Sequence, residues 1–233
     1  MCSQTVASVG ALPAETSDAV ELITIKLPVN PVSGTLPTPH VLNQLMNQQS
    51  DHTIVMAGGC FWCLDAWFRQ VRGVNHVESG YTGGGDAPAD YYSVCTGTTG
   101  HAEAVAVTFD PTVISDDTVL DMFFTMHNPT TLNGQGYDVG TQYRSALFTN
   151  SKEQSELFEA AIERNQPNWA EPIVTSIEPL GPWYAAETEH QNYYQRNRQA
   201  GYCHVIIDPK LSAARARFVK FLESDAPTSN SLG

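Results

Sequence analysis

The spacing of apolar residues changes in an orderly way along the middle of the chain. Alternating or short continuous apolar runs predict strands, and apolar residues three or four apart predict helices. The predicted order is a strand, a helix, two strands, a helix, a strand, a helix and a last strand. Their ranges are 53–57, 60–71, 74–81, 102–109, 116–126, 143–148, 151–164 and 172–178.

The first six of these elements follow the split βαβ pattern, which predicts a ferredoxin-like core. We therefore expect an α+β fold, a two-layer α/β plait. A doubly wound parallel sheet needs a helix between successive strands, and none fits between 74–81 and 102–109.

Two of the predicted helices carry capping signals at their starts. Ser115 precedes Asp116 and Asp117, whose negative charges suit the N-terminal end of the helix dipole. Ser151 is followed three residues later by Gln154, which is the spacing of a capping box. The two signals mark the starts of the predicted helices 116–126 and 151–164.

The two ends of the chain differ in composition from the middle. Residues 1–50 hold five prolines among many serines and threonines, which predicts an N-terminal extension or wrapping arm. Residues 225–233 predict a flexible tail. One domain is expected between them, over residues 51–224, because a chain of 233 residues with 42% hydrophobic residues can bury a core.

The charge balance argues against two classes of partner. The formal net charge is −13, which repels the phosphates of nucleic acids and of anionic lipids. No segment approaches the roughly 18 apolar residues of a membrane span, and the N-terminus lacks the basic start of a secretory signal. We therefore expect a soluble cytoplasmic protein that binds neither nucleic acid nor membrane.

Five cysteines are too few for a disulfide framework in a chain of this length, so reduced thiols are expected. Two of them, Cys60 and Cys63, follow two glycines at the predicted start of a helix. Backbone N–H groups and the helix dipole favour a thiolate at Cys60, and the spacing is that of Cys-x-x-Cys redox motifs. A pair of small core residues is the alternative. A structural zinc site is not expected, because Cys95 and Cys203 stand alone.

Glu103 is a candidate proton donor. It shares one face of the predicted strand 102–109 with Val105, Val107 and Phe109, so its carboxyl group is expected in apolar surroundings. Burial disfavours the charged form and raises the pKa of a carboxyl group, which suits an acid at neutral pH. The alternative is a residue at a strand end that reaches water.

Six segments together resemble peptide methionine sulfoxide reductase of the A type, in that family's order over roughly residues 52–205. They are Gly59-Cys-Phe-Trp62, Gly80-Tyr-Thr-Gly-Gly84, Tyr92-Ser-Val-Cys-Thr-Gly-Thr-Thr-Gly-His-Ala-Glu103, His127-Asn-Pro-Thr130, Gln135-Gly-Tyr-Asp-Val-Gly-Thr-Gln-Tyr-Arg-Ser145 and Ala186-Glu-Thr-Glu-His-Gln191.

The resemblance implies reduction of methionine S-sulfoxide, free or in oxidised proteins, as a repair of oxidative damage. It implies that Cys60 is the nucleophile and Glu103 the acid. The substrate-binding residues that it implies are Phe61, Trp62, Tyr81, Asp138 and Tyr143. This set makes chemical sense, because a sulfoxide oxygen leaves only when it is protonated and its developing charge is stabilised.

The attack leaves Cys60 as a sulfenic acid, which a second thiol must reduce. Cys203 resembles the family's C-terminal resolving cysteine. Cys63 stands where many relatives have glycine, so Cys63 could resolve the sulfenic acid directly or relay the disulfide to Cys203. Cys203 is the favoured resolver, since a disulfide within one helical turn must meet tight geometry. The resemblance implies no metal and no bound cofactor, with thioredoxin as the external dithiol.

Two other functions fit part of the pattern. A thiol-based redox sensor or binding module for oxidised methionine would use the Cys-x-x-Cys pair without turnover. A thioredoxin-like disulfide oxidoreductase would use the same pair and would need no separate buried acid. A requirement for the Glu103 carboxyl group therefore distinguishes the reductase from both of these alternatives.

Overall fold

A computed structural model of the chain describes residues 50–223. The predicted tail at 225–233 and the predicted arm, apart from residue 50, lie outside the described residues. Within residues 50–223, no helix has the length and apolar character needed to cross a membrane.

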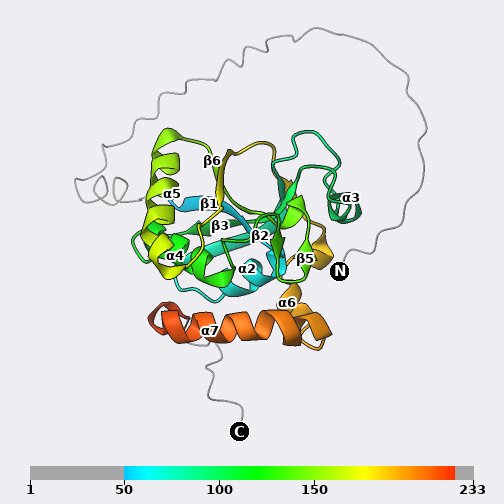
Figure 1. The fold of residues 1–233 in the computed structure, drawn as a ribbon. Coiled ribbons are helices and arrows are strands. Elements are labelled where there is room, and N and C mark those ends of the chain that lie inside the picture. Colours follow the sequence, from blue (N-terminus) through cyan, green and yellow to red (C-terminus); the bar gives the residue numbers. More distant parts are fainter. Residues whose placement is uncertain (1–49, 224–233) are drawn as a thin grey trace, which may run out of the picture. The chain divides into compact units, whose positions relative to one another are not determined.

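A mixed six-stranded sheet forms the centre of the fold (Figure 1). Its strands are β1 (His52–Gly58), β2 (Val74–Thr82), β3 (Ala102–Phe109), β6 (Ser145–Thr149), β7 (Ser176–Pro179) and β8 (Tyr184–Ala185). They lie in the order β7-β6-β1-β3-β2-β8, and every neighbouring pair is antiparallel except β6 and β7. A separate hairpin joins β4 (Gly134–Gln135) to β5 (Asp138–Val139). The expectation of a mixed α and β fold is confirmed.

Helices lie in several of the connections between the strands and after the last strand. The α-helices are α2 (Phe61–Phe68), α3 (Tyr91–Cys95), α4 (Asp116–Met126), α5 (Lys152–Asn165), α6 (Tyr193–Arg196) and α7 (Asp208–Phe218). Short 3₁₀ helices lie at Thr141–Tyr143, Gln166–Asn168, Thr188–His190 and Val219–Phe221, and a π-helix spans Cys203–Ile207. The eight predicted elements are all present, although the last two predicted strands begin two and four residues late, at 145 and 176.

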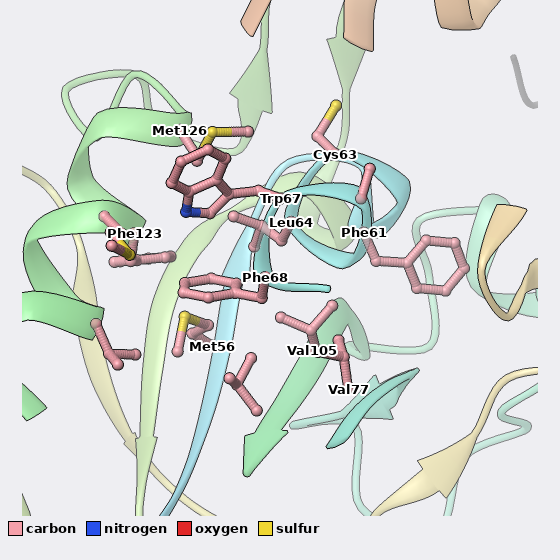
Figure 2. Packing of buried hydrophobic residues seen from close by; sticks show 14 of the residues in the cluster. Met56, Phe61, Cys63, Leu64, Trp67, Phe68, Val77, Val105, Phe123 and Met126 are labelled. Carbon is pink, nitrogen blue, oxygen red and sulfur yellow. The ribbon is translucent and has the colours of Figure 1, made fainter. Parts of the chain in front are cut away.

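The main core lies between the sheet and the helices α2 and α4. Met56 of β1 and Val105 of β3 face Phe68 of α2, and Phe123 of α4 closes the same cluster (Figure 2). These side chains are fully buried. Each large apolar side chain removed from water in this way contributes about 1.5–3 kcal/mol to the hydrophobic driving force.

The opposite face of the sheet has a smaller core. Val55 and Ala57 of β1 alternate with the residues that face the helices, and they pack with Ala104 and Phe148 beneath Trp183 of the β7–β8 connection. The strands are therefore buried on both faces. This explains why β1 is a continuous apolar run and not an alternating one.

Helix α7 was not predicted from the sequence. It packs on α2 and α4, on the side of these helices that faces away from the sheet (Figure 1). Its buried residues are Leu211, Ala214 and Phe218, and the ring of Phe218 lies 6.1 Å from that of Trp67. Only two large apolar residues in eleven give a weak helical pattern, so tertiary contact specifies this helix more than periodicity does.

The predicted caps are present, with one difference in their partners. Ser115 Oγ accepts from Thr118 N at 3.3 Å, and Ser151 Oγ accepts from Gln154 N at 3.1 Å. Gln154 Oε1 accepts from Asn150 N at 3.1 Å and not from the N-cap residue itself. The capping box is therefore extended by one residue toward β6.

A buried chain of hydrogen bonds joins the end of α4 to β6. His127 Nδ1 donates to the Phe123 carbonyl at 2.9 Å, so Nε2 is the acceptor for Ser145 Oγ at 2.7 Å. Ser145 Oγ in turn accepts from Thr175 Oγ1 at 2.7 Å. Burial lowers the pKa of His127 from 6.5 to about 4, and the imidazole is neutral at pH 7.

We predict that His127 makes the fold sensitive to acid. The folded protein binds a proton at this group less readily than the unfolded chain does, so stability is lost as the pH falls from 6.5 toward about 4. Between pH 7.5 and pH 5 this group alone removes about 2 kcal/mol. Urea unfolding of the wild type and of His127→Asn, whose amide can still donate to Phe123, measures the effect.

His127→Asn is expected to be less stable at pH 7.5 but to lose less stability on acidification. Replacement of the exposed His76 by Asn is the control and retains the wild-type slope. Equal slopes for His127→Asn and the wild type contradict the prediction.

Candidate active site

Two glycines place Cys60 at the start of α2. Gly59 has φ of +83°, and a Cβ atom there would lie 2.7 Å from the side chain of Gln135. The turn at this glycine makes Cys60 the N-cap, with an extended ψ of 123°. Cys63 N then donates to the Cys60 carbonyl at 3.2 Å. The two cysteines thus occupy the N-cap and N3 positions, which lie close together in a capped helix.

Glu103 lies on the face of β3 that meets the start of α2. Its Oε2 accepts from Phe61 N at 3.2 Å, and only 2% of the residue is exposed. Burial raises the pKa of Glu103 to about 8; the Phe61 N–H opposes the rise and the charge of Asp138 adds to it. The sequence left open whether this carboxyl group is buried or reaches water, and in the structure it is buried.

Cys60, Glu103 and Tyr202 line the same small cavity, and both neighbours influence the pKa of the thiol. Burial is the main reason that the pKa of Cys60 is raised well above 9.0, and the charges of Glu103 and Cys63 add to the rise. The sequence favoured a thiolate at the helix start, and the structure contradicts this: burial keeps Cys60 as a neutral thiol at pH 7.

A small cavity of about 10 Å³ opens beside the sulfur. This volume holds about one water molecule. The residues that line it are Cys60, Trp62, Tyr91, Glu103, Asp138, Tyr143 and Tyr202. An acid, a thiol and three phenol hydroxyl groups thus converge on a space of atomic size.

Trp62, Asp138 and Tyr143 are predicted binding residues that line the cavity, whereas Phe61 and Tyr81 do not line it. The ring of Phe61 lies deeper, 5.7 Å from the ring of Tyr81. Tyr81 is fully buried, and its hydroxyl group donates to Glu187 at 3.0 Å. Both residues therefore support the wall of the cavity from behind.

Sequence reasoning missed Tyr91 and Tyr202, although each adjoins a segment that it had singled out. Glu187 holds Tyr91 in place, because its Oε1 accepts from Tyr91 N at 2.8 Å while Oε2 accepts from Tyr81. Burial opposes ionisation of Glu187, but these hydrogen bonds lower its pKa overall. No local pattern marks Tyr91, since its partner is 96 residues away.

Asp138 and Tyr143 come from the loop after α4. Gln135 pins this loop, since its Oε1 accepts from Asn128 N at 3.0 Å and its Nε2 donates to the Asn128 carbonyl at 3.1 Å. The β4–β5 hairpin then presents Asp138, whose Oδ2 accepts from the Tyr202 hydroxyl at 3.0 Å. Burial raises the pKa of Tyr143, and the charges of Glu103 and Cys60 add to the rise, so its hydroxyl group is a neutral donor.

The C-terminal segment covers the aromatic wall. The ring of Tyr193 stacks on Trp62 at 3.7 Å and 9°, and the ring of Tyr202 meets Trp62 edge-on at 5.5 Å. His190 packs against the same indole at 5.7 Å. The face of Trp62, a predicted substrate-binding residue, is thus covered by side chains from residues 190–202.

The other two candidate cysteines lie inside the core. Cys63 is 1% exposed on α2, and Cys203 is fully buried at the first residue of the π-helix. Burial raises the pKa of both. The charge of an ionised Cys63 adds to the rise in the pKa of Cys60, and that of Cys203 adds to the rise in the pKa of Cys63.

Known proteins share both the sequence and the fold. A family model described as peptide methionine sulfoxide reductase matches residues 52–221. A relative from Arthrobacter sp. (strain FB24), named peptide methionine sulfoxide reductase MsrA, is 57% identical over 172 residues, which are 74% of this chain and 99% of the relative. A Deinococcus radiodurans protein of the same name is 53% identical over 194 residues, 78% of this chain and 93% of its own.

Solved structures agree with this match. Methionine sulfoxide reductase A of Corynebacterium diphtheriae is 34% identical with a TM-score of 0.62, covering 66% of this chain and 78% of its own. Reduced Mxr1 from Saccharomyces cerevisiae is 36% identical with a TM-score of 0.61, covering 67% and 91%. The chain belongs to the peptide methionine sulfoxide reductase family, of the A type, and is an enzyme that reduces methionine sulfoxide.

Proposed function

We propose that Cys60 attacks the sulfur of methionine S-sulfoxide, free or in a protein, while Glu103 protonates the sulfoxide oxygen. The observation that carries this proposal is the carboxyl group of Glu103, which is buried, has a pKa of about 8 and contacts the Cys60 thiol. A carboxyl group that keeps its proton at pH 7 is the donor that a poor oxygen leaving group needs. The cavity beside both groups supports the same site.

The step balances without a cofactor. The Cys60 sulfur bonds to the substrate sulfur, Glu103 gives its proton to the oxygen, and the thiol proton replaces the one that Glu103 gave. Transfer of the hydroxyl group to Cys60 then releases methionine and leaves a sulfenic acid, so the substrate sulfur is reduced by two electrons and the cysteine is oxidised by two. Tyr91 and Tyr143 supply hydroxyl donors for the developing charge on oxygen.

Substrate entry requires a movement of the C-terminal segment. A space of about 10 Å³ admits one oxygen atom but not a methyl sulfide group. Tyr193 and Tyr202 cover Trp62 and belong to this segment. We propose that the substrate methyl group replaces one of these rings against Trp62, with Phe61 supporting the indole from behind at 6.1 Å.

For the next step we propose a relay, in which Cys63 reduces the sulfenic acid and Cys203 then takes over the disulfide. Cys60 is the N-cap and lies outside the first helical turn, which weakens the argument from strain against a Cys60–Cys63 disulfide. Cys63 at N3 lies one helical turn from Cys60 at the N-cap, which supports its place as the first thiol to react. Thioredoxin, a dithiol protein, is the proposed final reductant, in the cytoplasm where such reductants keep thiols reduced.

We also propose that the core is a ferredoxin-like plait within a catalytic domain at 51–224. The order β6-β1-β3-β2, with every neighbouring pair antiparallel, supports the split βαβ arrangement. The strands β7 and β8 add to its two edges. The helix α7 extends the domain beyond a strict two-layer plait.

Removal of the acidic proton of Glu103 is expected to slow methionine formation. Glu103→Gln can still accept from Phe61 N but has no acidic proton, so we expect methionine formation to fall by about 10²–10⁴-fold with substrate binding largely retained. Rapid-quench measurement of one turnover on S-epimer substrate gives the rate. The exposed Glu163→Gln is the control and keeps the wild-type rate. A rate within threefold of the wild type for Glu103→Gln removes Glu103 from the mechanism.

The relay gives Cys203→Ser and Cys63→Ser different products after one turnover. Cys203→Ser is expected to release one methionine and stop with a Cys60–Cys63 disulfide, whereas Cys63→Ser releases one methionine and keeps Cys60 as a sulfenic acid. Peptide mapping after one turnover, with a nucleophile that traps sulfenic acids, identifies each product. The contrary result is a Cys60–Cys203 disulfide in Cys63→Ser that forms as fast as the wild type loses its sulfenic acid. It would show that Cys203 reduces the sulfenic acid directly.

A further inference from the structure

Lys210 lies in an unusual position for a lysine. It is half-buried on α7, and its Nζ donates to Cys63 Sγ at 3.9 Å. None of the ion pairs among residues 50–223 includes Lys210. Its charge also contributes to the lowered pKa of His127 at the end of α4.

Partial burial of an ammonium group is unfavourable unless a negative charge or several acceptors face it. The contact that the structure gives Lys210 is a sulfur atom, which is a weak acceptor as a thiol and a strong one as a thiolate. The position is therefore poor for stability in the resting enzyme and favourable once Cys63 ionises. Cysteines beside lysine are made more acidic by this effect.

We propose that Lys210 is a positioning residue for resolution: its ammonium group, in contact with Cys63 Sγ, stabilises the Cys63 thiolate as it forms and attacks the sulfenic acid of Cys60. This inference rests on the proposed function, because it requires the sulfenic acid that methionine formation leaves behind. It adds a residue from α7, a helix that contributes none of the residues lining the cavity.

The step that Lys210 promotes is balanced. The Cys63 thiolate attacks the sulfur of Cys60–SOH, the S–O bond breaks and an S–S bond forms. The hydroxide leaves as water with a proton from the Glu103 carboxyl group. Cys60 is reduced by one electron and Cys63 is oxidised by one, relative to sulfenic acid and thiolate, so no further oxidant or reductant is needed.

The charges that face Cys63 make a cation there necessary. Burial raises the pKa of Cys63, and Asp138 from β5, Glu103 from β3 and Cys203 from the π-helix add to the rise. Lys210 is the cation among the charged groups that act on Cys63, and its charge lowers the pKa. Without it, burial and three neighbouring groups all oppose the thiolate.

The test is a single turnover of the full chain with a stoichiometric amount of methionine S-sulfoxide. Released methionine measures the first step. Rapid alkylation with peptide mapping, in a Cys203→Ser background where the relay stops, measures the Cys60–Cys63 disulfide over pH 6–9.5. We expect Lys210→Met to release methionine at the wild-type rate but to form the disulfide about tenfold more slowly or less at pH 7. Its pH profile is expected to lie at higher pH, because Cys63 ionises later.

Lys210→Arg keeps the charge and is expected to restore the disulfide rate to within about threefold of the wild type. Replacement of the exposed Lys220 by Met is the matched control and changes neither step. A loss of packing alone slows the reaction equally at every pH and is not repaired by arginine. Glu103 titrates in all of these variants, so the displacement between profiles reports the lysine.

The outcomes separate the two claims. If the wild type releases no methionine, the proposed function fails. If methionine is released but Lys210→Met forms the disulfide at the wild-type rate and with the wild-type pH profile, the role of Lys210 fails while the proposed function stands. A slower rate with an unshifted profile also overturns the role of Lys210.

Discussion

The contact between the Glu103 carboxyl group and the first backbone N–H of α2 is the constraint on which the site depends. It joins the third strand to the start of the helix and leaves the carboxyl group beside the Cys60 sulfur, at an N–H···O distance of 3.2 Å. A carboxylate that lost this burial would be an ordinary surface acid, ionised at pH 7. The same burial suppresses ionisation of the thiol. In the proposed mechanism, this one desolvated space keeps both the acid and the nucleophile protonated until substrate arrives.

The candidate site is built from the sheet and α2 together with a segment near the C-terminal end of the described residues. The sheet and α2 supply the thiol and the acid, whereas residues 187–203 supply the support for Tyr91, the covering rings and the third cysteine. Tyr202 connects the two halves, because its hydroxyl group contacts both Asp138 and the Cys60 sulfur. Movement of this one segment would open the aromatic wall to substrate and expose Cys203 to an external dithiol. The proposed mechanism therefore links substrate entry and recycling through the same residues.

The parts of the site that follow from backbone geometry were predictable from the sequence. Alternation along 102–109 placed Glu103 on the helix-facing side, because the period of a strand is two whatever surrounds it. The two glycines before Cys60 likewise indicated the turn that makes it an N-cap. The order of helices and strands followed from periodicity for the same reason, while strand and helix ends shifted by a few residues.

Features set by distant contacts were not predictable. Tyr91, and not the predicted Tyr81, lines the cavity. Glu187, about a hundred residues away in the sequence, accepts from the Tyr81 hydroxyl group and from the Tyr91 backbone N–H. Cys60 stays protonated because it is buried, and local sequence does not report that burial. Helix α7 carries too few apolar residues to show a stripe, and its packing on Trp67 and its lysine beside Cys63 emerge only in three dimensions.

The pKa of Glu103 in the resting enzyme tests the central claim most directly. Carbon-13 NMR of protein labelled at glutamate side chains, with Glu103→Gln used to assign the signal, follows this carboxyl group as the pH is raised. The account predicts a titration midpoint of about 8. A midpoint near the ordinary glutamate value of 4.5 would show an ionised carboxylate at neutral pH and would contradict it.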